Sequence, residues 1–287
     1  MRRILGYLGL AGFAIGAFVC SLLPGGVWAA LLSANLRTGI AIPWAVPAAL
    51  ALLAVGWRFA GGQSPWRSEI RAAYRRANPV SARAFGWAML ANAFALAALG
   101  GLWILLHHLV RTHGNPVPDF SAYPLPVVGA VLACAAIVGA VGEEVALRGY
   151  LLGRLQRRAP WPVAVALVAL IAAPGHALTQ GFVWPTLLFY VLADLTYGIT
   201  ACLTDSILPG IVAHAAGLFV FFAFIWPHDA SRSLTTLDNN GLWTSIGQVA
   251  LSGALAVWAF SRLARTAASD RAARTVADIG TGTNVGA

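Results

Sequence analysis

The chain has 287 residues, of which 59% are hydrophobic and 10% charged, and its mean hydropathy is +0.74. A soluble domain would carry roughly a quarter charged residues, so the composition excludes an ordinary soluble enzyme and indicates a polytopic helical membrane protein. The net charge of +9 comes from arginine alone, since the sequence contains no lysine. No basic face alternates with exposed aromatic residues, and we therefore expect no nucleic-acid partner.

Apolar stretches that reach about 20 residues, the length that crosses a bilayer, predict about eight transmembrane helices. They lie near residues 4–32, 40–59, 84–110, 124–147, 161–179, 184–204, 207–226 and 241–262. The first stretch is interpreted as an uncleaved span, with a signal peptide ending near Ala29 as the alternative. The predicted fold is an all-α transmembrane bundle that forms one domain over residues 1–265, followed by a disordered cytoplasmic tail over residues 266–287.

Two prolines and one turn are expected to shape these spans. Pro24 is expected to break the first span near its outer end, and Pro174 is expected to kink or end the fifth. Asp205 and Ser206 are expected to form a short turn with an N-cap that joins the sixth and seventh spans as an antiparallel hairpin.

Arginine placement predicts the orientation of the bundle. With a cytoplasmic N-terminus, fifteen arginines fall in cytoplasmic segments and only Arg37, Arg111 and Arg232 fall in outer loops. This asymmetry satisfies the positive-inside rule for eight spans with both termini in the cytoplasm. The basic segment 67–83 either determines topology or contacts anionic headgroups. Arginine-only basicity and abundant alanine suggest a bacterial source, so we expect an integral protein of the cytoplasmic membrane whose first partner is the lipid bilayer.

Ionisable residues inside apolar spans are costly, and they indicate functional sites. The candidates here are Glu143, Glu144, Arg148, His176, Asp194 and His214. Glu144 and Arg148, four residues apart on a helix, can pair. Glu143 is turned about 100° away, and without a local partner it can serve as a general base. The alternative is that both glutamates simply lie at the cytoplasmic interface.

Two histidines on other spans favour a convergent site. Together with a carboxylate, His176 and His214 could activate water and stabilise an oxyanion. The same groups could bind zinc, but the HExxH pattern is missing, and we predict neither metal nor cofactor. Asp194 is interpreted as a structural contact or an auxiliary group. The remaining histidines are interpreted as interfacial residues; they are His107, His108, His113 and His228.

The segment EEVALRG, residues 143–149, resembles the EExxxR motif of the CPBP family of intramembrane proteases, also called the CAAX protease or Abi family. In that family an FxxxH motif and then an HxxxN motif follow, and His176 and His214 resemble their histidines. Gly198 and the stretch DSILPGIVAHA also resemble the family pattern, and the resemblance covers about residues 124–226.

The resemblance implies an endopeptidase in which Glu143, assisted by His176, activates water while His214 polarises the scissile carbonyl. Glu144 and Arg148 would hold the geometry of the site, with no metal. The implied partner is a membrane-associated peptide or protein substrate, and nothing in the sequence indicates that it is prenylated or sets the oligomeric state.

Two positions depart from the family pattern. Ala172 replaces the phenylalanine of FxxxH, and Leu218 replaces the asparagine of HxxxN. Loss of one oxyanion donor typically costs ~10²–10³ in rate, which a protonated Asp194 or a backbone amide could offset. The alternative functions are a non-proteolytic scaffold or immunity-type protein of the same fold and, less favoured because no internal repeat is present, a transporter.

Overall fold

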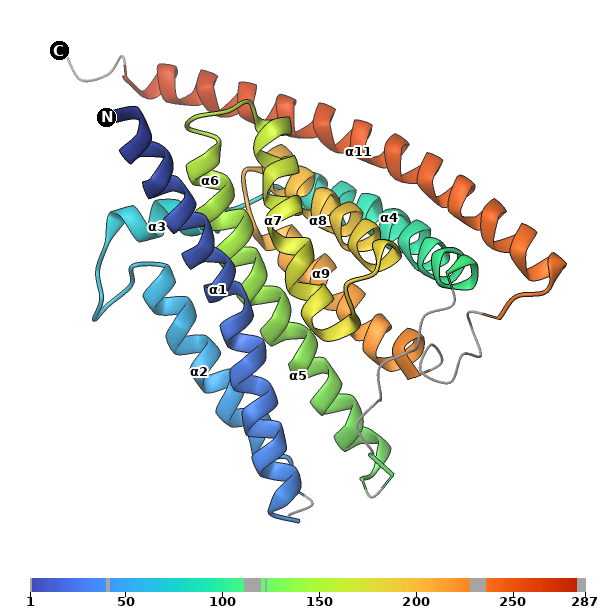
Figure 1. The fold of residues 1–287 in the computed structure, drawn as a ribbon. Coiled ribbons are helices and arrows are strands. Elements are labelled where there is room, and N and C mark those ends of the chain that lie inside the picture. Colours follow the sequence, from blue (N-terminus) through green and yellow to red (C-terminus); the bar gives the residue numbers. More distant parts are fainter. Residues whose placement is uncertain (1, 40–41, 111–119, 122, 228–235, 283–287) are drawn as a thin grey trace.

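The computed structural model describes residues 2–39, 42–110, 120–121, 123–227 and 236–282 (Figure 1). All regular elements in these ranges are helical, which confirms the all-α prediction. In chain order they are α1 (Arg2–Arg37), α2 (Ala45–Ala60), α3 (Glu69–Arg75), α4 (Ala82–Leu109), α5 (Leu125–Glu143), the π-helix η1 (Glu144–Leu151), α6 (Leu152–Leu155), α7 (Trp161–Gln180), α8 (Trp184–Thr204), α9 (Leu208–Val220), the π-helix η2 (Phe221–Ile225) and α11 (Asn239–Gly282).

Within the described ranges, seven helices are long and apolar enough to cross a membrane, and they coincide with seven of the eight expected spans. The expected second span is α2, whose 16 residues make it shorter than the others. It extends about 24 Å, less than the ~30 Å of a bilayer core. Even so, α2 runs back beside α1, and α1 begins at the same end of the bundle at which α11 ends (Figure 1). The side of the membrane on which this end lies stays a prediction.

The two prolines are accommodated inside continuous helices. Helix α1 passes through Pro24 and α7 passes through Pro174, so the predicted break of the first span is wrong and α7 does not end at its proline. Helix packing explains the continuity at Pro24, because a Cβ on Gly142 of α5 would lie 2.6 Å from the Pro24 Cγ. Neighbouring helices hold such a helix together despite its missing backbone hydrogen bond.

The predicted turn between α8 and α9 is present and is bound to the basic segment. Asp205 ends α8 in a left-handed conformation, and the Ser206 hydroxyl accepts a hydrogen bond from the Leu208 amide. The N-cap of α9 is Ile207, one residue beyond the predicted pair. Arg76 donates to Asp205 Oδ1 over 2.9 Å, and its carbonyl accepts the Ile207 amide. Intramolecular contacts therefore fix part of segment 67–83.

The C-terminal segment continues α11 as far as Gly282, so a disordered tail from residue 266 is not observed over 266–282. Alanine and arginine, which favour helices, are frequent here, and Ala267 is buried. The helix is also tied to its neighbours, because Asp270 Oδ2 accepts the Ser81 hydroxyl and Arg271 donates to the Leu203 carbonyl.

Gly198 lets α8 approach α7 closely. A Cβ at this position would lie 2.7 Å from Val165 Cγ1, and Val165 belongs to the buried core between α7, η1 and α1. We expect Gly198→Ala to lower the free energy of unfolding by about 1–3 kcal/mol, because the β-branched valine has few rotamers with which to yield. Unfolding in detergent would measure the loss, and Val165→Ala added to Gly198→Ala should recover part of it. An unchanged stability in the single variant would contradict this contact.

Candidate active site

The two glutamates lie well inside the bundle. Glu143 is the last residue of α5 and Glu144 the first of η1, within an apolar helix that runs on to Leu155. The Glu144 side chain is 0% exposed and that of Glu143 is 14% exposed. Twelve further residues separate Glu143 from the helix end, roughly 15–18 Å. Both acids are therefore enclosed by neighbouring helices and are not surface groups of the bundle.

Glu143 faces two histidines from other helices. Its Oε2 atom lies 3.6 Å from Nε2 of His176 in α7 and 3.8 Å from Nε2 of His214 in α9. These distances exceed those of direct hydrogen bonds. The structure thus brings together the three groups whose convergence the sequence predicts, with a single carboxylate oxygen between two imidazole nitrogens.

Glu144 has a second partner that the sequence reasoning missed. Its Oε1 atom lies 3.5 Å from Arg148 Nη1, which is the predicted ion pair, and also 3.1 Å from His214 Nδ1, within hydrogen-bond distance. Gly210 makes room for this contact, because a Cβ there would lie 2.7 Å from Glu144 Oε2. His214 therefore bridges the two glutamates, with Nδ1 on Glu144 and Nε2 on Glu143.

Asp194 of α8 belongs to the same buried network. Its Oδ1 atom accepts a hydrogen bond from Arg148 Nη2, and its carbonyl lies 3.4 Å from the same nitrogen. Arg148 is fully buried between two carboxylates, those of Glu144 and Asp194. Asp194 thus makes a structural contact within the site.

Two tyrosines of α8 complete the site, and the sequence reasoning did not single them out. The Tyr190 ring stacks on His176 with centroids 3.9 Å apart, and the Tyr197 ring stacks on His214 with centroids 4.3 Å apart. Both lie on the helical face of Asp194, at i−4 and i+3. This spacing was the available signal.

The two departures from the family pattern have different consequences. Ala172 is buried in the apolar core, and the Pro174–Gly175 pair does not separate His176 from Glu143. Leu218 packs against α5, its Cδ1 lying 3.3 Å from where a Cβ on Gly139 would be. Position 218 therefore adjoins the turn before Glu143 but supplies no hydrogen-bond donor.

Other polar groups lie apart from this cluster. His107 is buried and stacks on Trp103, the His108 Nδ1 atom accepts a hydrogen bond from the Leu237 amide, and His113 and His228 fall outside the described residues. The described ranges contain no group of three or more His, Cys, Asp or Glu arranged to hold a metal ion.

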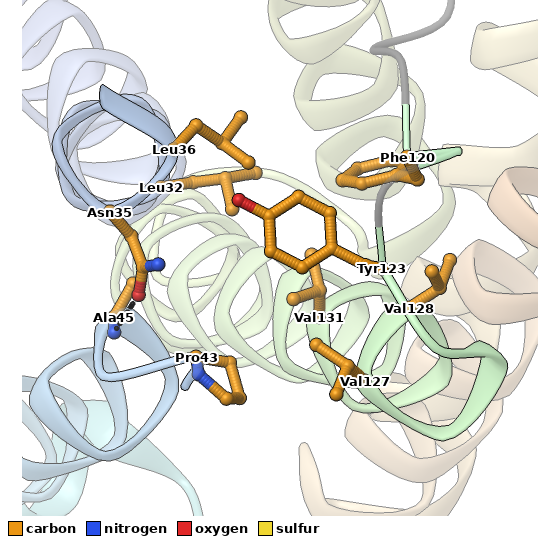
Figure 2. A pocket seen from close by; sticks show the side chains of 10 residues that line it. All are labelled: Leu32, Asn35, Leu36, Pro43, Ala45, Phe120, Tyr123, Val127, Val128 and Val131. Carbon is orange, nitrogen blue, oxygen red and sulfur yellow. Dashed lines mark hydrogen bonds between the residues drawn. The ribbon is translucent and has the colours of Figure 1, made fainter. Parts of the chain in front are cut away.

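A small apolar pocket lies between α1, α2 and α5, toward the end of α1 (Figure 2). The residues that line it are Leu32, Asn35, Leu36, Pro43, Ala45, Phe120, Tyr123, Val127, Val128 and Val131. None of the candidate site residues contributes to this lining.

The fold and the site define a polytopic membrane protein with a carboxylate–histidine cluster buried between its helices. Residues 125–220 match a family model whose description is type II CAAX prenyl endopeptidase Rce1-like. This segment runs from the start of α5 to the end of α9 and contains all the candidate site residues, which confirms the resemblance drawn from the motifs. Neither a curated protein nor a solved structure matches the chain.

Proposed function

We propose that the protein is an intramembrane endopeptidase that hydrolyses peptide bonds of membrane-associated peptides or proteins. The observation that carries the proposal is the position of Glu143 Oε2, 3.6 and 3.8 Å from the Nε2 atoms of His176 and His214. A water molecule bound among these atoms would have a base beside it and an imidazole on either side. The family match over residues 125–220 supports the same class of reaction.

In the proposed reaction, Glu143 takes a proton from water while the water oxygen bonds to the scissile carbonyl carbon. His176 orients this water. Collapse of the tetrahedral intermediate breaks the C–N bond, and Glu143 returns the proton to the leaving amine.

His214 is proposed to stabilise the oxyanion as a cation. Because Glu144 accepts from Nδ1–H, the Nε2 atom carries a proton only when the ring is charged. The Glu144 Oε1 atom lies 3.1 Å from Nδ1, within hydrogen-bond distance. Nε2–H can then donate to the oxyanion.

Leu218 affects the expected rate of peptide cleavage, because its side chain offers no hydrogen-bond donor. With no amide at this position, His214 is the proposed side-chain donor to the oxyanion, and we expect turnover ~10²–10³ below that of a two-donor site. The same apolar residue favours the second candidate, a non-proteolytic scaffold or immunity-type protein of this fold.

We further propose that the protein resides in a bacterial cytoplasmic membrane with both ends of the chain in the cytoplasm. The beginning of α1 and the end of α11 lie at one end of the bundle, together with the arginine-rich α3 (Figure 1). The arginine distribution supports an inner-side position for this end, because positively charged loops favour the cytoplasmic side.

The test is hydrolysis by protein reconstituted in phospholipid vesicles. The substrates are a library of synthetic transmembrane peptides and a CAAX peptide with and without its prenyl group, in ¹⁸O-labelled water with or without a chelator. We expect cleavage that survives the chelator and places one ¹⁸O atom in the new carboxyl terminus. Cleavage that the chelator abolishes and zinc restores would overturn the glutamate mechanism in favour of a metal site. No cleavage under any condition would favour the scaffold.

A further inference from the structure

Helix α8 presents one buried face to the site, formed by Tyr190, Asp194 and Tyr197. Residues at spacings of four and three lie on the same side of a helix. None of them belongs to the motifs that suggested the function. Each nevertheless contacts a different helix that carries a candidate site residue: α7, η1 and α9.

The two tyrosine contacts have the same geometry. The rings of Tyr190 and His176 are nearly parallel, with 9° between their planes, and those of Tyr197 and His214 are at 16°. The imidazoles come from helices on separate segments of the chain, yet both are covered by rings two helical turns apart on α8. Asp194, between the tyrosines, holds the arginine that pairs with Glu144.

We propose that Tyr190 and Tyr197 are positioning residues that hold the imidazoles of His176 and His214 in the plane in which both Nε2 atoms face Glu143. This inference rests on the proposed function. The tyrosines act through the histidines and not on the substrate. Helix α8 thereby adds a ring contact to each imidazole, and His214 is held in addition by the contact of its Nδ1 atom with Glu144.

The physical reason is the soft torsion of histidine. The ring turns about the Cβ–Cγ bond with only broad, roughly two-fold preferences, so an uncovered imidazole can swing its nitrogens away from Glu143. A parallel aromatic ring in contact with the imidazole face blocks that rotation. A displacement of about 1 Å of a catalytic group can cost ~10²-fold in rate.

A simpler role for the tyrosines is to fill the core, and substitutions separate the two roles. Tyr190→Phe and Tyr197→Phe keep the stacked ring, whereas Tyr190→Leu and Tyr197→Leu fill similar space without a flat face. Tyr74→Leu is the matched control, because Tyr74 stacks on Tyr150 away from the site, with centroids 5.6 Å apart.

The first readout is independent of cleavage. In protein with ¹³C-labelled histidine rings, NMR in lipid nanodiscs should show upfield ring-current shifts for His176 and His214, assigned by their loss in His176→Gln and His214→Gln. Tyr190→Leu should remove the shift of His176 only, Tyr197→Leu that of His214 only, and both phenylalanine variants should keep them.

The second readout is the rate of peptide cleavage. We expect each leucine variant to lose about 10–10²-fold in kcat with little change in KM, and the phenylalanine variants and Tyr74→Leu to stay near wild type. Full activity in the leucine variants, or an equal loss in the phenylalanine and leucine variants, would overturn the proposal. If wild type cleaves nothing, the proposed function fails, while the NMR shifts still decide whether the tyrosines orient the histidines.

Discussion

Replacing Glu143 with glutamine is expected to reduce peptide cleavage by about 10²–10⁴-fold, the range for removal of a general base. The amide matches the carboxylate in size but cannot take a proton from water. Little stability should be lost, because Glu143 Oε2 makes no hydrogen bond within the described residues. Initial rates in vesicles and unfolding in detergent, measured on the same preparations, would separate the two effects.

Glu69→Gln is the matched control for this substitution. Glu69 is the one glutamate of the sequence besides Glu143 and Glu144. It is exposed in the first turn of α3, away from the cluster. Its variant should cleave at the wild-type rate. A Glu143→Gln protein that folds and still cleaves within about threefold of wild type, a change far below the range for a general base, would remove Glu143 from the mechanism.

Replacing Arg148 with methionine is expected to lower the free energy of unfolding by about 3–5 kcal/mol, the cost of leaving buried charges unpaired. The guanidinium is fully buried between Glu144 and Asp194, so its removal leaves Asp194 without its ion pair and Glu144 with its His214 contact but without the arginine. Unfolding by titration with SDS would measure the loss. Arg157→Met is the control, because Arg157 is exposed over the Tyr74 ring, and it should cost under about 1 kcal/mol.

A second substitution tests whether the cost comes from the stranded charges. Adding Asp194→Leu to Arg148→Met removes one unpaired carboxylate, and the double variant should be more stable than the sum of the single losses predicts. Strictly additive losses would show that Arg148 contributes volume and not charge pairing.

Most helices of this fold could be predicted from the sequence, since each span must be long and apolar whatever surrounds it. The predictions failed where packing overrode a local signal. Pro24 did not break α1, which contacts α5 at Gly142, and residues 266–282 continue α11, which is bound to its neighbours through Asp270 and Arg271. The short α2, which packs on α1 and α5, falls below the length expected of a span.

The membership of the site was also within reach of the sequence. A charged side chain inside a span needs a polar partner. Because few such side chains occur in this chain, each can be expected to have the others as its partners. Glu143, Glu144, Arg148, His176 and His214 were predicted to converge, and the distances between them show that they do.

Which contacts each of these side chains makes could be seen only in the tertiary structure. Helical geometry predicted that Glu143 and Glu144 point apart by about 100°, with Glu144 engaged only by Arg148. Both glutamates nevertheless contact His214, 70 residues further along the chain from Glu144, because one imidazole presents nitrogens on two of its edges. The α8 tyrosines likewise meet histidines of other helices. The sequence by itself determined which polar residues must be buried together. Which of their atoms meet was decided only by the rotation and packing of α8 and α9 against η1. Contacts between helices depend on the shapes of both helix surfaces and not on the residue spacing within one helix.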